Sequence, residues 1–560
     1  MSRGRAVAFG LVLLAALAVA LALPARAVPL PTDTLLNAPV VRGVMHVHSN
    51  RSDGAGSIGA IAAAAGRAGL SFVIVTDHGD GTRTPDSPAY LDGVLVIDAV
   101  EISTGGGHVV AFGLPAAPFP LGGEARDVIA DVLRLNGVSI AAHPGSPKDE
   151  LRWTDWSLPV DGLEWLNGDS EWRDESAGSL ARALLTYPFR RSETLAGLLD
   201  RPALIRQWDS LLADRPVVAV TGADAHARLG LRGDPLGGGA ALPIPAYEHV
   251  FRTSSIGIPR LALGGDAAAD AASIVTAIAE GNVFSVVDAL ARPASFGFTA
   301  SSSGIRVGVG GRLPVGEPVE LAVTSNAPPA ARITLLKDGV SIAEAAGPTL
   351  KHSAAAGPGV YRVEVALPGA PGTPPVPWIL SNPIYVRPPL AAVSLRTPVA
   401  ETAVQYSSGP ATGWAVEQSP RAQGALDVVP TLDGTELSIR YALSGTRTEG
   451  PFVAAAMPAG PVAGYDRLSF TARAVRPMRL SVELRAPQGA QGERWGRSVY
   501  LDETPRPVTV FFDEMTPRGA TSSSRPDLAR TDSVLFVVNT THAPPGSSGV
   551  VWLDDVAFGR

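Results

Sequence analysis

Seven short apolar segments recur between residues 42 and 222 and alternate with longer segments of helical or loop pattern. The apolar segments are rich in Val and Ile, and their apolar residues run almost without interruption. This pattern is typical of parallel strands that are buried on both faces of a sheet. The expected strands cover residues 43–47, 72–76, 95–100, 109–114, 138–142, 162–166 and 217–221, and the expected helices cover 58–70, 125–136 and one or two segments within 192–213.

The alternation of strands and helices predicts an α/β domain over residues 28–297, either a (β/α) barrel or an open doubly wound sheet. Potential metal ligands, such as His48 and His143, lie at or just after the ends of the expected strands. Barrel enzymes place their active sites at the C-terminal ends of the strands, so this position favours the barrel. Residues 284–298 are expected to close the domain.

The pattern changes after residue 298, where short segments of alternating polar and apolar residues are separated by Pro and Gly clusters. Residues 298–388 are therefore expected to form a small, Ig-like β-sandwich. Residues 389–560 again contain many short expected strands. They predict a second β-sandwich of jelly-roll type, and its last segment, Trp552 to Val556, resembles the final strand of carbohydrate-binding jelly rolls.

The first 27 residues have the pattern of an export signal. Arg3 and Arg5 precede an apolar run over residues 6–23, and Ala25-Arg26-Ala27 supplies small residues at a cleavage site. Cleavage after Ala27 would release a periplasmic or extracellular protein without a transmembrane segment. The alternative is an uncleaved membrane anchor, because the apolar run is nearly long enough to span a membrane.

Composition narrows the classes of partner and of chemistry. The chain is 46% hydrophobic and 18% charged, which is typical of a globular protein. Its net charge of −7, without a long Lys/Arg run, argues against nucleic-acid binding. Because the chain contains no cysteine, disulfides, cysteine–zinc sites and thiol catalysis are excluded.

Six of the nine histidines lie in the first 230 residues, together with three carboxylates near strand ends. Imidazole and carboxylate groups are the usual protein ligands of zinc, manganese and iron. Nine ligands are too many for one tetrahedral ion and suit two or three ions that share a carboxylate. The candidate ligands are His46, His48, Asp53, His78, Glu101, His108, His143, Asp224 and His226.

The ordered motifs HxHSxxSDG, TDH, Glu…GGHV, AHP and DAH resemble the PHP family, the polymerase and histidinol phosphatase domain, over roughly residues 42–297. The resemblance implies a distorted seven-stranded barrel with up to three metal ions. It implies a first ion at His46, His48, Glu101 and Asp224, a second at Glu101, His108 and His143, and a third at Asp53, His78 and His226. Asp77 is expected to orient a ligand or to move a proton, and so to act with Glu101 and Asp224 in catalysis.

The activity expected from this resemblance is phosphate mono- or diester hydrolysis by a metal-activated hydroxide. Two cations about 3.5–4 Å apart lower the pKa of a shared water enough to give hydroxide near neutral pH. Arg173, Arg228 and Arg232 are candidates for binding a substrate anion. Two alternatives stay open: hydrolysis of a carbamate or carboxylic ester at the same metals, and a glycan-binding surface protein whose barrel has vestigial activity.

Overall fold

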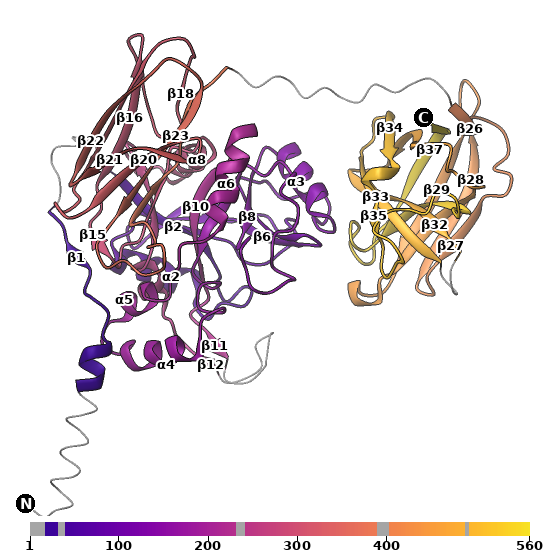
Figure 1. Cartoon of the computed structure of the whole chain (residues 1–560). Coiled ribbons are helices and arrows are strands. Elements are labelled where there is room, and N and C mark those ends of the chain that lie inside the picture. Colours follow the sequence, from indigo (N-terminus) through magenta and orange to yellow (C-terminus); the bar gives the residue numbers. More distant parts are fainter. Residues whose placement is uncertain (1–16, 32–39, 231–240, 389–401, 488–491) are drawn as a thin grey trace, which may run out of the picture. The chain divides into compact units, whose positions relative to one another are not determined.

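The computed structural model describes residues 17–31, 40–230, 241–388, 402–487 and 492–560 (Figure 1). The chain divides into two compact units. The first comprises residues 1–79, 84–115 and 124–391, and the second comprises residues 80–83, 116–123 and 392–560. Each unit is described separately below.

A closed ring of strands forms the centre of the first unit. Parallel pairing joins β5 to β3, β3 to β2, β2 to β10, β10 to β9 and β9 to β8. Each of the seven segments expected to be strands overlaps a strand of this ring, and the segment 95–100, expected as one strand, overlaps two, β5 and β6. The strands are β2 (Val40–Val47), β3 (Phe72–Val75), β5 (Val94–Asp98), β6 (Val100–Thr104), β7 (Gly107–Phe112), β8 (Val138–Ala142), β9 (Gly162–Asn167) and β10 (Val218–Ala225).

One strand of the ring runs against the expected direction. β7 pairs antiparallel with both β6 and β8, so the expectation of an all-parallel sheet is wrong here. The reason is the short turn at Gly105 to Gly107, because a parallel connection needs a crossover of a dozen or more residues. The hairpin puts the first residues of β7 on the same rim as the last residues of its neighbours.

Helices follow only some of the ring strands, so the alternation is less regular than in an ideal (β/α) barrel. Ser57 caps α2 by accepting the backbone N–H of Ala60, and Gly69 ends it in the left-handed conformation. The helices are α2 (Ile58–Ala68), α3 (Ala125–Arg134), α4 (Ala177–Thr186), α5 (Arg191–Ala196), α6 (Leu204–Asp214), α7 (Tyr247–Phe251) and α8 (Ala267–Ala279). The predicted helices over 58–70 and 125–136 are confirmed, and 192–213 holds two helices.

A sheet continues from the ring into residues 298–388. β13 (Ser255–Pro259) pairs with β2 and with β14 (Phe284–Val286), and β14 pairs with β24 (Ile379–Ser381). The sheet then passes through β23 (Gly359–Ala366), β20 (Arg332–Lys337), β21 (Val340–Ala346), β25 (Ile384–Val386) and β18 (Arg312–Leu313). Although a boundary at 297/298 stays a prediction, backbone pairing crosses that position.

A second sheet packs on this one and completes a sandwich around a common apolar core. It consists of β17 (Ile305–Gly308), β16 (Phe296–Ser302), β19 (Val319–Ser325) and β22 (Thr349–Ala354). Phe296, Trp378 and Tyr361 are almost completely buried in the core. The side-chain amide of Asn382 is also buried and bonds Ala219 of β10 through both its oxygen and its nitrogen, which ties the sandwich to the ring.

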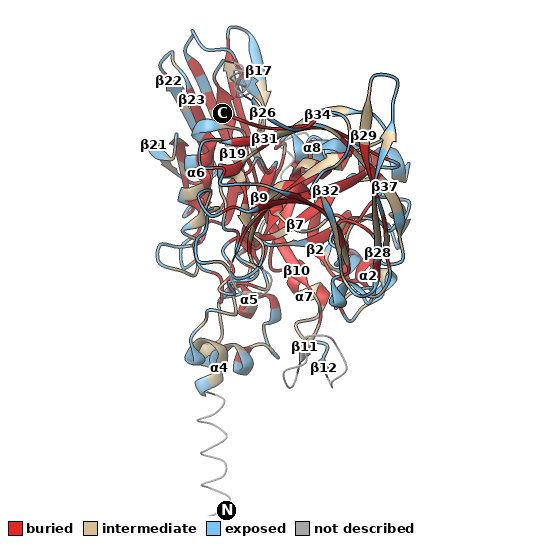
Figure 2. Cartoon of the chain, turned by 90° about the vertical axis from the view of Figure 1, so that its right-hand side faces the viewer, coloured by how far each residue is buried: buried red, intermediate tan, exposed pale blue. Residues whose placement is uncertain are grey.

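The second unit is a β-sandwich of two six-stranded antiparallel sheets. One sheet contains β26 (Thr402–Tyr406), β28 (Ala422–Pro430), β29 (Thr435–Leu443), β31 (Arg467–Ala474), β34 (Arg506–Phe511) and β37 (Ser548–Gly559). The other contains β27 (Ala415–Gln418), β30 (Phe452–Pro458), β32 (Met478–Ala486), β33 (Glu493–Leu501), β35 (Thr516–Pro517) and β36 (Ser533–Asn539). Figure 2 shows buried residues following the strands of both units. The sandwich class expected for this segment is confirmed.

The expected cleavage position stays a prediction, and the described residues 17–22 before it are helical. β1 (Val28–Pro29) pairs with β15 (Ala291–Arg292). Most of the expected signal, residues 1–16, lies outside the described residues. Within the described part of the chain, no helix has the length and apolar character needed to cross a membrane.

Candidate metal centre

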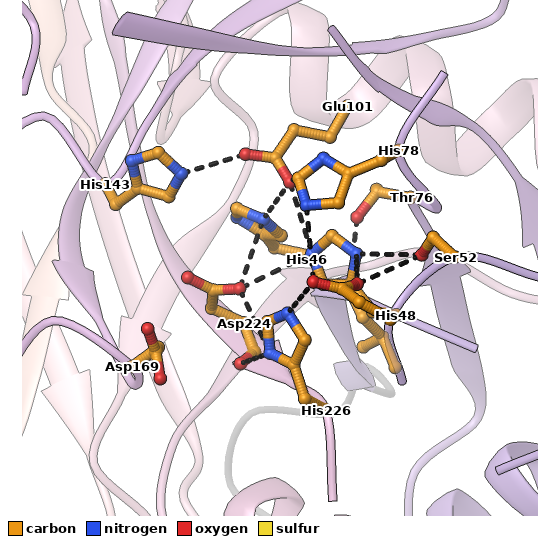
Figure 3. A network of polar contacts seen from close by, with 12 residues as sticks. His46, His48, Ser52, Thr76, His78, Glu101, His143, Asp169, Asp224 and His226 are labelled. Carbon is orange, nitrogen blue, oxygen red and sulfur yellow. Dashed lines mark hydrogen bonds and ion pairs between the residues drawn. The ribbon is translucent and has the colours of Figure 1, made fainter. Parts of the chain in front are cut away.

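The nine candidate ligands lie close together on one rim of the ring, and Figure 3 labels seven of them. His46 is near the end of β2 and His48 follows it, while His78 and His143 follow β3 and β8. His108 is the second residue of β7, and it reaches this rim because β7 is antiparallel. The nine side chains form four overlapping groups in which the ligand atoms lie within 4.8 Å of one another.

Glu101 is the centre of the cluster and is fully buried. Its Oε2 lies 3.2 Å from Nε2 of His46 and 3.2 Å from Nε2 of His48. Its Oε1 lies 2.7 Å from Nδ1 of His108 and 2.8 Å from Nε2 of His143. Oε2 also lies 3.3 Å from Nδ1 of His78. The two oxygens therefore face different sets of histidines, which is the arrangement of a carboxylate that can bridge two ions.

Two further carboxylates complete the cluster. Oδ1 of Asp224 lies 3.4 Å from Nε2 of both His46 and His48. Oδ2 of Asp53 lies 3.6 Å from Nε2 of His78 and 3.3 Å from Nε2 of His226. The three ligand sets that the family resemblance implies thus lie within one cluster, but the groups found there combine His143 with His46 and His108 with His78. How the ligands divide among ions, and whether ions occupy them, stay predictions.

Three of the candidate ligands on the rim have a strained backbone conformation. His46, His143 and Asp224 have positive φ values of 62°, 31° and 45°. Such values are uncommon for residues other than glycine and cluster at functional sites. His46 and His48 converge although His46 is not in a regular strand conformation.

Buried polar atoms in the cluster lack the partners that burial requires. Nε2 of His46, Nε2 of His48 and Oε2 of Glu101 are buried and make no hydrogen bond. Unpaired buried polar atoms are costly and rare in native proteins. Nitrogen and oxygen atoms that converge without hydrogen bonds suit a cation, so the residues present fit divalent metal ions.

Charge in the cluster shifts the pKa values of both kinds of ligand. Burial alone would lower the pKa of His48, but the carboxylates of Asp224 and Glu101, 3.4 and 3.2 Å from its Nε2, raise it to about 10. Burial alone would raise the pKa of Glu101, but the charge of His46 and the hydrogen bonds of His108 and His143 hold it well below its ordinary value. The raised pKa values of His46 and His48 mean that, without metal, these two histidines hold protons that compensate the carboxylates.

These protonated histidines predict that metal binding depends strongly on pH. A metal ligand must be a neutral imidazole, so binding has to displace protons. We expect protons to be released when Zn²⁺ or Mn²⁺ binds at pH 7, and apparent affinity to rise from pH 6.5 towards the His48 pKa of about 10. Calorimetric titration in two buffers of different ionisation enthalpy measures the number of protons released. Binding heats that are the same in both buffers would contradict this prediction.

Sequence reasoning missed Glu164, which supports two of the ligands from β9. Its Oε1 lies 2.6 Å from Nδ1 of His46, and its Oε2 accepts the backbone N–H of His143 at 2.8 Å. Oε2 also accepts the side-chain amide of Asn167. A carboxylate in an otherwise apolar buried strand was the available signal, because a buried charge needs a partner.

Substitution of Glu164 tests this supporting role. In Glu164→Gln the neutral amide can no longer hold the Nδ1 proton of His46 as strongly. Changes of such outer partners typically lower metal affinity or activity by about 10–100-fold. We expect a loss of this size in metal affinity, measured by competition with a chromophoric chelator. The circular dichroism spectrum should be unchanged. Glu280→Gln, an exposed glutamate at the end of α8, is the control.

Asp77 lies behind the cluster and acts on the turn after β2. Its Oδ1 accepts the backbone N–H of Ser49 and the hydroxyl of Ser52, both at 2.7 Å. Ser52 directly precedes Asp53 and lies 3.4 Å from Nδ1 of His48. The geometry makes Asp77 a positioning residue for this turn, in agreement with the expected orienting role.

The three candidate anion-binding arginines differ in their surroundings. Arg173 donates through Nε to Asp169 at 2.6 Å and lies over the ring of Trp172 at 4.6 Å. Its charge is thus paired with a carboxylate. Arg228 is half-buried in the wall of a pocket beside the cluster. Arg232 lies outside the described residues.

Comparisons with known proteins leave the family open. No family model matches the chain, and no curated protein matches it. One similar solved structure is the family 11 carbohydrate-binding module of the cellulosomal cellulase Lic26A-Cel5E of Clostridium thermocellum. It has 16% identity over 29% of this chain and 96% of that chain, with a TM-score of 0.25.

Two other solved structures give similar values. A carbohydrate-binding module described for specific mannan recognition has 12% identity over 29% of this chain and 96% of that chain, with a TM-score of 0.20. An exo-β-agarase has 11% identity over 26% of this chain and 23% of that chain, with a TM-score of 0.19. At these TM-scores the similarities carry no argument about function.

Proposed function

We propose that this chain is an exported hydrolase of PHP type that uses two or three divalent metal ions to hydrolyse phosphate mono- or diesters. The observation that carries the proposal is the arrangement around Glu101, whose two oxygens face separate sets of histidines in a buried cluster. Zinc, manganese and iron all suit this mixture of imidazole and carboxylate ligands.

The side chains of the cluster divide into groups with distinct tasks. His46, His48, Glu101 and Asp224 would hold one ion, Glu101, His108 and His143 a second, and Asp53, His78 and His226 a third. When bound, such ions lower the pKa of a water to give a nucleophile and neutralise negative charge on the substrate.

The chain's own residues keep this site in place. Glu101 is inaccessible to solvent, so water does not compete for its oxygens. Glu164 orients His46, and Asp77 fixes the turn that carries Asp53. His78, Asp53 and His226 are the more exposed ligands, with side-chain exposures of 36%, 34% and 22%, so substrate can approach from their side.

A second candidate is hydrolysis of a carbamate or carboxylic ester at the same cluster. The observation that favours it is the pairing of Arg173 with Asp169, which compensates one of the charges expected to attract a phosphate. A neutral ester needs no such charge.

The glycan-binding alternative receives no support from the tryptophans of the second unit. Trp495 is 1% exposed and belongs to the core, and Trp414 stacks on Phe536. The guanidinium of Arg473 lies over the ring of Trp552 at 3.8 Å. These contacts are those of packed aromatic side chains.

Metal content and turnover on one preparation test the proposal. The protein starting at Val28 is assayed with p-nitrophenyl phosphate, bis-p-nitrophenyl phosphate and an aryl N-methylcarbamate. Two or three ions per chain with phosphate ester turnover would support the leading proposal. Bound ions with carbamate turnover alone would favour the second candidate, and a protein that binds no ions and hydrolyses nothing would contradict both.

A further inference from the structure

A pocket of about 290 Å³ opens beside the metal-ligand cluster. One wall is the segment from Asp224 to Arg228, which carries two of the candidate ligands. The opposite walls come from α4 and from the segment around α5. Figure 3 shows Asp169, another wall residue, on the Asp224 side of the cluster.

The walls away from the cluster are mainly apolar. α4 contributes Leu180, Ala183 and Leu184, and the segment around α5 contributes Leu195 and Leu198. Leu184 is 68% exposed and lies at the mouth of the pocket. Exposed apolar side chains around a concave surface are typical of ligand sites.

The two acidic groups in the walls away from Asp224, which are Asp169 and Glu171, contribute little free charge. Asp169 accepts hydrogen bonds from Nε of Arg173 and from the indole N–H of Trp172. Burial raises the pKa of Glu171 to about 8, so this carboxyl group is largely protonated at neutral pH. An uncharged apolar group therefore suits the pocket better than a cation.

We propose that this pocket binds an aryl or branched alkyl group of the substrate ester and so presents the scissile bond beside Asp224 and His226. This inference rests on the proposed hydrolase function and adds the substrate class to it. A cavity of about 150 Å³ is sufficient for benzene, so the pocket accommodates one aromatic group with its linking atoms. It is at the lower end of the volume range of ligand pockets, which disfavours a bulky polar substrate.

A pair of alcohol phosphates measures the contribution of the pocket. Benzyl phosphate and methyl phosphate release alcohols of similar basicity, so their ratio of kcat/KM reports mainly the apolar group. With the full chain and added Mn²⁺, followed by phosphate release, we expect benzyl phosphate to be favoured by about 10–100-fold, the factor for burying one phenyl ring. A ratio near one would overturn the inference.

A substitution that fills the pocket tests whether the preference for benzyl phosphate arises there. Ala183→Phe places a ring in the pocket, whereas Ala181→Phe, two residues earlier on α4 and exposed, does not reach it. We expect the benzyl-to-methyl ratio to fall at least about tenfold in Ala183→Phe and to stay unchanged in Ala181→Phe. Equal ratios in the two variants would overturn the assignment of the pocket.

Binding of 2-naphthol, measured by calorimetry in the presence of EDTA, separates the pocket from catalysis. We expect the Kd of 2-naphthol to be at least about tenfold higher for Ala183→Phe than for the unmodified chain. Binding that Ala183→Phe does not weaken would overturn the inference. If Ala183→Phe weakens the binding of 2-naphthol but neither phosphate is hydrolysed, the result would support the pocket and contradict the proposed phosphoesterase function.

Discussion

Replacement of Glu101 by glutamine is expected to remove most of the bound metal and to lower turnover by more than about 100-fold. Oε2 of Glu101 faces three histidines and Oε1 faces two, and the side chain is fully buried. Its substitution should therefore cost more than the 10–100-fold that is typical for residues behind the ligands. Glutamine keeps the size of the side chain, so the change removes charge and a ligand atom without creating a cavity.

Metal content by mass spectrometry and turnover on the best substrate test the effect of Glu101→Gln. The metal content and turnover of Glu164→Gln should lie between those of Glu101→Gln and those of the unmodified chain. Glu280→Gln should match the unmodified chain in both. Full metal content in Glu101→Gln would show that Glu101 does not hold the ions. His143→Ala and Asp224→Ala should lose metal as well, because each contributes an atom to one of the groups within 4.8 Å.

Removal of metal is expected to lower the melting temperature of the first unit by about 10 °C. One ion present at 1,000 times its dissociation constant stabilises the folded state by about 4 kcal/mol. For a large domain, each kcal/mol changes the melting temperature by about 2–4 °C. The effect should be large here because protonated histidines must replace the ions in the buried cluster.

The second unit provides an internal control for metal removal. None of its residues belongs to the four metal-binding groups found among the described residues, so EDTA should leave its unfolding transition in place. Differential scanning calorimetry with and without EDTA resolves the two transitions, and Zn²⁺ or Mn²⁺ in excess should restore the first. A first transition that does not respond to EDTA or to added metal would refute a structural contribution of the ions.

Much of the candidate site could be predicted because its residues are local neighbours of strand ends. His46 and His48 border β2, and Asp224 and His226 border β10, so locating the strands was sufficient to locate these ligands. Apolar runs of four to eight residues are visible in the sequence, and so are the polar residues that interrupt them. The same local information is sufficient to predict α2, which Ser57 caps at its start and Gly69 ends.

Other parts of the site depended on contacts between distant segments. Glu164 meets His46 across 118 positions, and the pairing appears only when β9 and β10 close the ring next to β2. The pocket beside Asp224 needs α4 and the segment around α5 to lie against the end of β10. No local pattern specifies such an approach.

The sequence by itself determined where strands form, which residues follow them and which chemistry those residues can support, because these properties depend on side chains only a few positions apart. The tertiary structure decided that β7 is antiparallel, that the sheet continues from β14 into β24, and that the two oxygens of Glu101 face different histidines. These features follow from closure of the ring. Closure is stabilised by apolar burial summed over many segments, and it sets the final positions of side chains that are far apart in the chain.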